Sequence, residues 1–306
     1  MSDIERRLLG RTGLSVTTLG FGAMDLGGPP AANEISDDEA NQVLNAVLDT
    51  GINFIDTAVC YGTSEARIGR AISHRRKEFV LATKCGCVPG EPMGKPHVYD
   101  RKNIRAGVEH SLRAMRTDYL DIAQFHTSLT RSEWEAEGAL DELLKLKQES
   151  KVRFIGISGI LPNLAQQVES GVFDVFQVPY SALQREHEHI IAKASSAGAG
   201  IIIRGGVARG TPNNWNKRYY MLSGDELSGR WNKAQLDELL DGMSRIEFMV
   251  RFAIAEAALD TTIIGTKNLD HLRDNVAAAR KGPLPPVVVA EAKRRLDANG
   301  SRPTSS

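Results

Sequence analysis

Short apolar segments alternate with amphipathic segments along most of this chain of 306 residues. The apolar segments are rich in strand-forming residues and are apolar on both sides, as is typical of strands in a parallel sheet covered on both faces. Many of them end in a glycine or a polar residue that precedes a helix start. Eight segments are therefore expected to be strands: 18–22, 53–56, 79–84, 121–126, 153–158, 175–178, 200–204 and 262–265.

Helices are expected between these strands, because apolar residues recur there with helical spacing. Clear examples are 39–48, 104–115, 140–147 and 248–257. Eight strand–helix units in a chain of this size predict an α/β fold, a closed (β/α)8 TIM barrel.

A β-hairpin is expected ahead of the first unit, where segments 7–9 and 15–16 flank a Gly-Arg-Thr-Gly turn at 10–13. We expect this hairpin to cap the bottom of the barrel. The pattern shows no domain boundary, so 1–297 is predicted to be a single domain. The remaining residues, 298–306, are predicted to be a disordered tail.

Two connections are longer than usual for a compact domain. Residues 24–36 are rich in glycine, proline and alanine, and residues 205–232 are rich in aromatic side chains. Long connections of this kind are often functional. The aromatic residues of the second connection are Trp215, Tyr219, Tyr220 and Trp231.

The composition is that of an ordinary globular protein, with 42% hydrophobic and 25% charged residues. Lys and Arg number 38, as do Asp and Glu. This balance argues against nucleic acid or an anionic membrane as the main partner. The charged N-terminus has no signal-like apolar segment, and no stretch reaches the about 18 apolar residues of a membrane span. A cytoplasmic location is the resulting expectation.

The chain has three cysteines, Cys60, Cys85 and Cys87, which do not form the paired framework of small secreted proteins. The Cys-x-Cys at 85 and 87 could hold a soft metal ion. However, neither a second cysteine pair nor a His-x-x-x-His motif accompanies it. No metal is therefore expected, and Cys85 and Cys87 are interpreted as reduced structural thiols.

Polar residues follow consecutive predicted strands at the points where those strands end. Asp56 ends the second strand, and Tyr61 comes five positions later; Lys84 ends the third strand, and His126 ends the fourth. In a barrel of this type, the carboxyl ends of the strands meet at one face and carry the chemistry. Single polar residues at strand ends are often only structural, but four on adjacent strands are expected to point into one shallow bowl.

Several motifs spread over most of the chain resemble those of the aldo-keto reductases. Their order and spacing together are more specific than any one of them. They are Arg-Leu-Leu-Gly-Arg-Thr-Gly-Leu-Ser-Val at 7–16, Leu-Gly-Phe-Gly-Ala-Met at 19–24, Gly-Ile-Asn-Phe-Ile-Asp-Thr-Ala at 51–58, Tyr-Gly at 61–62 with Ser-Glu at 64–65, Asp-Tyr-Leu-Asp-Ile at 118–122 before His126, Ile-Gly-Ile-Ser at 155–158 and Gln-Val-Pro-Tyr-Ser at 177–181.

The resemblance implies reduction of an aldehyde or ketone, in which the carbonyl oxygen needs a proton as hydride arrives at carbon. Tyr61 is the expected general acid. A free tyrosine has a pKa of about 10, and the ammonium of Lys84 is expected to lower it. Asp56 would hold Lys84 in place, and His126 would orient the carbonyl. The hydride must come from a cofactor, since no side chain can supply it.

The nicotinamide half of that cofactor is expected across the barrel mouth. By resemblance, Gly22 and Ala23 end the first strand beside it, and Ser158 and Gln177 hold its carboxamide. The family commonly has Asn after this serine, but Gly159 stands here, so one amide contact is missing or replaced. Arg204 occupies a position that is often Tyr in the family, and a planar guanidinium can also stack on the ring.

The adenine half is expected where the eighth strand meets its helix. Gly265, Thr266 and Lys267 precede that helix, and a helix N-terminus favours phosphate. His271 stands where many NADPH-specific members carry Arg, and Asn275 lies one turn further on. Because of Lys267, NADPH is the preferred cofactor, with NADH as the alternative.

The substrate is expected to be a small-molecule carbonyl compound, and the enzyme a monomer or weak homo-oligomer. Met24, Cys60, Trp215 and Tyr219 are candidate pocket walls, although the aromatic residues could equally anchor the loop. Two other interpretations stay open. One is a regulatory subunit that senses the cofactor; the other is a barrel lyase in which Lys84 forms a Schiff base.

Overall fold

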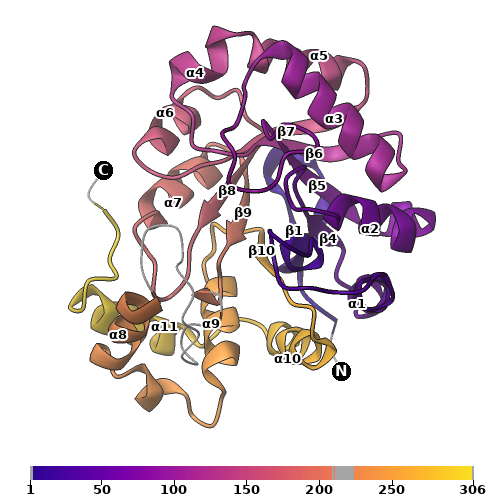
Figure 1. Cartoon of the computed structure of the whole chain (residues 1–306). Helices are drawn as coiled ribbons and strands as arrows, with labels where there is room; N and C mark the ends of the chain where they lie inside the picture. The colour runs from indigo at the N-terminus through magenta and orange to yellow at the C-terminus, as the bar shows by residue number, and fades with distance from the viewer. Residues whose placement is uncertain (1–2, 209, 211–223, 305–306) are drawn as a thin grey trace.

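The computed structural model describes residues 3–208, 210 and 224–304. Eight parallel strands form a closed barrel at the centre, and helices surround it (Figure 1). The predicted (β/α)8 barrel is therefore confirmed. The barrel strands are β3 (Leu19–Gly22), β4 (Phe54–Asp56), β5 (Val80–Cys85), β6 (Leu120–Phe125), β7 (Val152–Ser158), β8 (Val175–Pro179), β9 (Gly200–Arg204) and β10 (Thr261–Ile264).

The barrel closes because β10 pairs with β3 on one side and with β9 on the other. In this register Ile264 lies opposite Phe21, and Ile263 lies opposite Arg204. Nearly all strand residues are buried, since side chains point either into the barrel or onto the helices. The strand ends that carry polar residues therefore meet at one face.

The helices lie outside the barrel, and some begin earlier than the apolar pattern indicates. The first of them begins at Asp37, where Ser36 and Glu39 form a capping box. The first turn of this helix is polar and adds nothing to the apolar spacing, so the spacing alone predicted a start at 39. The helices are α1 (Asp37–Asp49), α2 (Ser64–Ile72), α3 (Arg101–Met115), α4 (Arg131–Ala136), α5 (Ala139–Gln148), α6 (Asn163–Glu169), α7 (Glu188–Ser196), α8 (Gly224–Lys233), α9 (Arg245–Ile254), α10 (Leu269–Arg280) and α11 (Pro286–Asp297).

The predicted hairpin is present as β1 (Arg6–Leu8) paired antiparallel with β2 (Ser15–Thr17). Leu9, Leu14 and Val16 of this segment are buried in one cluster with side chains from inside the barrel. The barrel members of that cluster lie towards the strand starts and include Phe54, Val80, Ile122, Val175 and Ile202. The hairpin therefore closes the barrel at the end opposite the polar strand ends.

Gly10 shows how closely this plug fits. Its φ is +47°, and a Cβ added there would lie 2.3 Å from the backbone nitrogen of Gly200. Only glycine permits both the left-handed conformation and this approach of two backbones. The turn is fixed further by Asp260, whose carboxylate accepts from the Gly10 N–H at 3.1 Å.

The long connections differ from expectation in two places. The end of the aromatic-rich connection belongs to α8, residues 224–233. Trp231 on that helix is fully buried, and its indole N–H donates to Asp237 at 3.0 Å. Trp231 therefore anchors the segment. Trp215, Tyr219 and Tyr220 lie outside the described residues. A third long connection, 86–100 between β5 and α3, was not anticipated.

Residues 298–304, for which disorder is expected from the sequence, contact the connection after β8 in the described structure. Ser301 is fully buried, and its hydroxyl donates to the Ala182 carbonyl at 2.9 Å. The Thr304 N–H donates to the Glu186 carbonyl at 3.2 Å. These contacts attach the chain end to the connection after β8.

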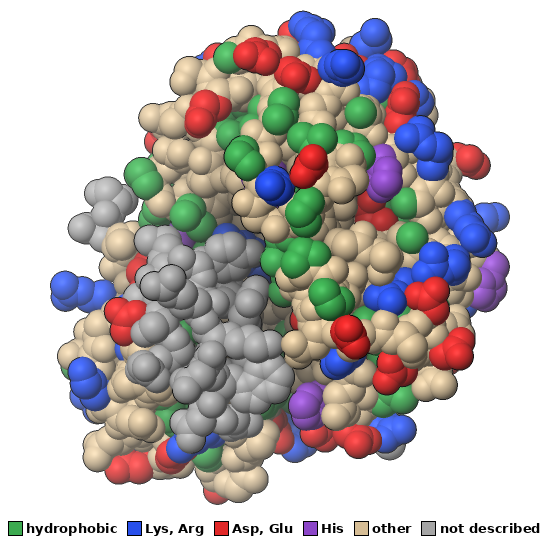
Figure 2. Space-filling model, in the orientation of Figure 1, with side chains coloured by type: hydrophobic (Ala, Val, Ile, Leu, Met, Phe, Trp, Pro, Cys, Tyr) green, Lys and Arg blue, Asp and Glu red, His purple; other side chains and the backbone are tan. Residues whose placement is uncertain are grey.

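Within the described residues, none of the helices is both long and apolar enough to cross a membrane. Side chains of both charge signs are interspersed over the face seen in Figure 2, in keeping with the balanced composition.

Candidate active site

Asp56 and Lys84 form a buried ion pair at the ends of β4 and β5. Both residues are about 2% exposed. The Lys84 ammonium donates to Asp56 Oδ2 and, at 2.9 Å, to the carbonyl of Thr57. Asp56 of β4 lies opposite Ala82 of β5. Lys84 comes two positions after Ala82, so its side chain points to the same side of the sheet as that of Asp56. The structure thus brings these two predicted residues into direct contact.

The other oxygen of Asp56 is also occupied. Oδ1 accepts from the side-chain amides of Gln124, at 3.2 Å, and Gln177, at 2.8 Å. The Ser158 hydroxyl in turn donates to Gln177 Oε1 at 3.2 Å. A buried charge is tolerated when its hydrogen-bonding capacity is satisfied in this way. Gln177, predicted to hold a cofactor amide, therefore also links Asp56 to Ser158.

Tyr61 and His126 face each other next to this pair. The Tyr61 hydroxyl lies 3.4 Å from His126 Nε2, and the two rings meet edge to face with centroids 5.6 Å apart. The Lys84 ammonium lies 5.0 Å from the centre of the Tyr61 ring. The four polar residues expected at the strand ends thus lie in one place.

His126 is placed between Tyr61 and two thiols. Its Nδ1 lies 3.5 Å from Cys60 Sγ and 3.0 Å from Cys87 Sγ. Burial lowers the pKa of His126 below its ordinary value of 6.5, so the imidazole is neutral at neutral pH. A neutral imidazole can donate one hydrogen bond and accept another.

A cavity of about 210 Å³ opens directly onto these side chains. We call it the bowl. One wall comes from the connection between β5 and α3, which the sequence pattern did not single out. The bowl is lined by Cys60, Tyr61, Lys84, Cys87, Val88, Glu91, Pro92, Met93, Gly94, Lys95, Pro96, His97, His126, Thr127, Ser158, Gln177 and Arg204.

The predicted adenine-side residues lie at the junction of β10 and α10. Asn268 caps that helix, and its side chain accepts from the backbone N–H groups of Asp270 and His271. Lys267 is exposed and donates to the Glu34 carbonyl of the 24–36 connection at 2.6 Å. His271 is exposed and Asn275 is buried.

The strand ends next to this helix lie side by side, because β3 and β10 are paired. A Cβ added to Gly22 would lie 3.7 Å from the Gly265 nitrogen, and one added to Gly265 would lie 2.7 Å from the Gly22 carbonyl oxygen. Thr266 and Ala23 follow these glycines and are buried. The four residues form one narrow strip at the barrel mouth.

Comparison with known proteins agrees with this arrangement. The family model described as "Aldo/keto reductase family" matches residues 18–296. The chain belongs to the aldo/keto reductase family. It is accordingly an oxidoreductase of carbonyl compounds that uses a nicotinamide cofactor.

Individual relatives cover almost the whole chain. L-galactose dehydrogenase of Arabidopsis thaliana is 28% identical, over 91% of this chain and 89% of its own. The NADH-specific methylglyoxal reductase of Escherichia coli is 26% identical, over 88% and 92%. The structure of the aldo-keto reductase AKR11C1 from Bacillus halodurans, holo form, matches with a TM-score of 0.83 and 27% identity, and covers 99% of both chains.

At Gly159, this aldo/keto reductase departs from the common asparagine in a way the structure explains. A Cβ at Gly159 would lie 2.4 Å from Gln167 Oε1 and 3.1 Å from Leu164. The Gln167 side chain therefore occupies the space that a larger residue would need. Its nitrogen donates to the Leu129 carbonyl at 2.6 Å, whereas its buried Oε1 has no hydrogen-bond partner among the described residues.

The polar groups of the bowl decide whether the site suits a nicotinamide. A carboxamide is an N–H donor as well as an acceptor, and Ser158 and Gln177 bring a hydroxyl and an amide to the bowl. Ser158, Gln177 and Arg204 line the same bowl as Tyr61. The residues present therefore fit the cofactor that the family uses.

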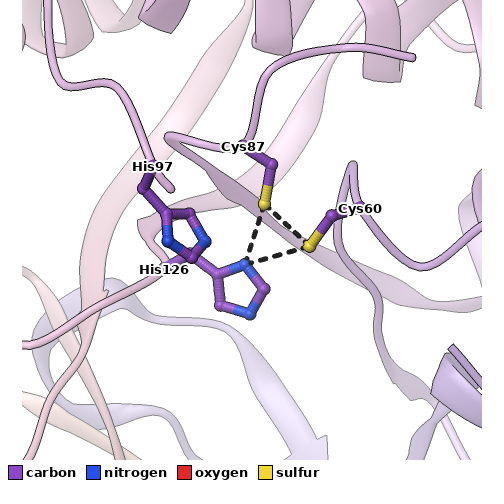
Figure 3. A group of neighbouring side chains, drawn as sticks. All are labelled: Cys60, Cys87, His97 and His126. Carbon is purple, nitrogen blue, oxygen red and sulfur yellow. Dashed lines mark hydrogen bonds between the residues drawn. The ribbon is translucent and has the colours of Figure 1, made fainter. Parts of the chain in front are cut away.

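The bowl also contains residues that sequence reasoning did not identify as functional. Cys87 and His97 come from the β5–α3 connection and lie with Cys60 and His126 in one group (Figure 3). The Cys87 thiol donates to Cys60 Sγ at 2.8 Å, and this hydrogen bond lowers the pKa of Cys60 while raising that of Cys87. Cys85 is separate: its thiol donates to the Gln124 carbonyl at 3.3 Å, and burial raises its pKa to about 12.

Met24 does not line the bowl in the described part of the chain. It packs against the cluster formed by Ala58, Val59, Cys60, Tyr61 and Cys87. Met24 therefore supports the segment that carries Tyr61.

Proposed function

We propose that this chain reduces an aldehyde or ketone to an alcohol with NADPH, and that Tyr61 donates the proton. The observation that carries the proposal is the position of the Tyr61 hydroxyl, 3.4 Å from His126 Nε2 on the wall of the bowl, with the Lys84 ammonium 5.0 Å from its ring. A carbonyl oxygen placed between Tyr61 and His126 would meet two hydrogen-bond donors.

Lys84 acts on Tyr61 through its charge. As the phenol gives up its proton, negative charge develops on the oxygen, and the nearby ammonium stabilises it. Asp56 holds Lys84 in position through their ion pair, and Gln124 and Gln177 hold Asp56. The same ion pair opposes a Schiff-base mechanism, which requires a neutral lysine.

His126 orients the carbonyl. Its ring is neutral at neutral pH and lies against Tyr61. A proton on Nε2 would be donated to the carbonyl oxygen, which polarises the C=O bond and directs it towards Tyr61.

The cofactor, when bound, supplies the hydride. Ser158 and Gln177, which line the bowl, would hold its carboxamide, and Arg204 lines the bowl where a guanidinium could stack on the ring. Gly22, Ala23, Gly265 and Thr266 form the strip beside it. The resemblance assigns these four residues to the cofactor, and the pairing of β3 with β10 supports this because it brings them together.

NADPH is preferred over NADH because of Lys267. This lysine lies at the N-terminus of α10 with Asn268, and both a helix N-terminus and an ammonium favour a phosphate. His271 and Asn275 would complete the adenine site. One relative is named as NADH-specific, and His271 is a weaker phosphate ligand than arginine, so NADH is the alternative.

The substrate is proposed to be a small carbonyl compound that contacts Cys60 and Thr127 in the bowl. The proposal includes a cytoplasmic location and a monomer or weak homo-oligomer, both of which come from the sequence.

Replacement of the proposed acid tests the mechanism. Tyr61→Phe should lower kcat by about 10²- to 10⁴-fold, the usual contribution of a positioned acid, while NADPH binding measured by fluorescence is kept. The matched control is Tyr99→Phe, which removes a hydroxyl bonded to Thr127 at 2.7 Å on the neighbouring loop. NADPH oxidation over a panel of aldehydes, ketones and sugars is the readout. Full activity in Tyr61→Phe would contradict the assigned acid.

A further inference from the structure

Four metal-ligating side chains lie together at one side of the bowl (Figure 3). Cys60 follows β4, Cys87 and His97 belong to the connection between β5 and α3, and His126 follows β6. Their ligand atoms all lie within 4.8 Å of one another. Three segments far apart in the sequence therefore supply two sulfurs and two ring nitrogens to one point.

We propose that Cys60, Cys87, His97 and His126 form a tetrahedral site for Zn²⁺. This inference goes beyond the reductase activity and does not depend on it. The expectation of no metal was based on sequence spacing, which showed only Cys85 and Cys87. In the fold, Cys85 lies outside the group of four ligands, and the cysteine that accompanies Cys87 is Cys60.

The three distances among Cys60, Cys87 and His126 suit a tetrahedral ion after a small adjustment, and a His97 ring nitrogen lies within 4.8 Å of the other ligand atoms. With Zn–S near 2.3 Å and Zn–N near 2.0–2.1 Å, neighbouring donor atoms lie roughly 3.3–3.8 Å apart. Cys60 Sγ is 3.5 Å and Cys87 Sγ is 3.0 Å from His126 Nδ1. The two sulfurs are 2.8 Å apart and must separate by about 1 Å, within the reach of a χ1 adjustment on two loops.

The donor chemistry also selects this kind of ion. Thiolate and imidazole ligands favour Zn²⁺ and disfavour Mg²⁺ or Ca²⁺, which need oxygen ligands. Two thiolates balance the charge of the cation, so the filled site is neutral. A neutral site suits the surroundings, because Cys60 and Cys87 are 6% and 4% exposed.

The proposed ion is structural, because protein ligands fill all four positions and leave none for substrate. Its effect on the bowl is indirect. Zn²⁺ on His126 Nδ1 leaves the proton on Nε2, which is the nitrogen 3.4 Å from the Tyr61 hydroxyl. Coordination by Cys87 and His97 also fastens the 86–100 connection beside Tyr61.

Metal titration of the full-length chain tests the site without an activity assay. The protein is purified with a thiol reductant and stripped with a chelator. It is then titrated anaerobically with Co²⁺ and afterwards with Zn²⁺. We expect one Co²⁺ per chain, with the strong visible bands of tetrahedral cobalt and a thiolate-to-cobalt charge-transfer band. Zn²⁺ should displace it in equal amount.

Three variants locate the ligands. Cys87→Ser and His97→Ala should each weaken Zn²⁺ binding by more than about 100-fold. Loss of a residue that only supports a ligand costs up to about 100-fold, and loss of a ligand itself should cost more. Cys85→Ser is the matched control, because it removes a thiol two positions away that is outside the group; it should bind as the parent does. Zn²⁺ should also slow amide hydrogen exchange across 86–100 in the parent and in Cys85→Ser, but not in Cys87→Ser.

Several results would overturn the site. Substoichiometric uptake by the reduced parent is one, and uptake that survives both Cys87→Ser and His97→Ala is another. A Cys60–Cys87 disulfide that forms readily, together with no metal uptake after its reduction, would mean that the two thiols form a redox pair. Loss of binding in Cys85→Ser alone would place the metal elsewhere.

Discussion

The bowl has two halves that are stabilised differently. Around β4, β5 and β6 the groups that matter are buried and ionisable: Asp56 pairs with Lys84, and the buried Glu65 carboxyl accepts from Thr83 of β5. Around β7 to β10 they are mostly neutral amides and hydroxyls, with Arg204 at the end of β9 and the exposed Lys267 at the rim. We call these the charged half and the neutral half.

The departures that the sequence resemblance indicates agree with this difference. A change in the charged half leaves a buried ion without its partner, whereas a change in the neutral half alters a hydrogen bond that water or a neighbouring side chain can replace. Gly159, Arg204 and His271 all lie in the neutral half or on its rim. Nothing departs around Tyr61. The four predictions below test this contrast, from the largest expected effect to the smallest.

Asp56→Asn should have the largest effect. It leaves the buried Lys84 ammonium without a counter-charge, and removal of one partner of a buried pair typically costs about 3–5 kcal/mol. Urea unfolding monitored by circular dichroism measures this loss. Asp56→Asn combined with Lys84→Met removes both charges and should recover most of the stability while the enzyme stays inactive. A double variant as unstable as the single one would contradict the charge argument.

Glu65→Gln should change how stability depends on pH. Burial raises the pKa of Glu65 from its ordinary value of 4.5 to about 7, although the hydroxyls of Thr83 and Ser111 donate to its Oε1. The folded state therefore holds the proton more tightly than the unfolded state. The stability that this group provides is complete below about pH 4.5 and is lost as the pH rises to about 7.

The size of that loss follows from the pKa change. At about 1.36 kcal/mol for each pKa unit, it amounts to about 3 kcal/mol. Glu65→Gln cannot ionise and keeps the Oε1 acceptor. It should match the parent near pH 4 and exceed its free energy of unfolding by about 3 kcal/mol at pH 8. If the free energy of unfolding depends on pH in the same way for both proteins, the pKa of Glu65 is not raised by folding.

Gly159→Asn tests the neutral half by steric means. The new side chain would collide with Gln167, and overpacking of this kind costs about 1–3 kcal/mol. Gly159→Asn with Gln167→Ala should regain most of this stability, because the smaller residue leaves room for the asparagine. Thermal unfolding of both variants measures the effect. If the single variant is as stable as the parent, Gln167 does not fill that space.

Lys267→Ala should have the smallest effect, and a selective one. It should weaken NADPH binding about tenfold, or about 1.4 kcal/mol, and leave NADH binding almost unchanged. Fluorescence titration with each cofactor gives the two dissociation constants. Arg273→Ala is the control, since Arg273 lies on the same helix but pairs outward with Asp270. Equal losses for NADPH and NADH would remove the phosphate role.

Much of the barrel and of the charged half could be inferred from sequence, because both follow from local rules. Strands show as short apolar segments, and the ends of parallel strands meet at one face. These two rules alone place Asp56, Lys84 and His126 together. Gln124 was within reach of the same reasoning: it is a polar residue inside a buried strand, two positions before His126 and so on the same side.

Other parts of the site depend on packing between distant segments, which spacing does not report. His97 lies in a connection without apolar period, so its approach to Cys60 follows only from the path of 86–100. Gln167 fills the space beside Gly159 from the following helix, and this too requires the fold. Trp231 was assigned to a loop because the helix that carries it is short and mostly polar.

The hairpin at the start of the chain has a kinetic consequence. Leu9, Leu14 and Val16 are buried among side chains from inside the barrel and close its lower end. A molecule that reaches Tyr61 must therefore leave in the direction from which it came. Entry and exit then share the barrel mouth, and a cofactor that lies beneath the substrate would have to bind before it and leave after it.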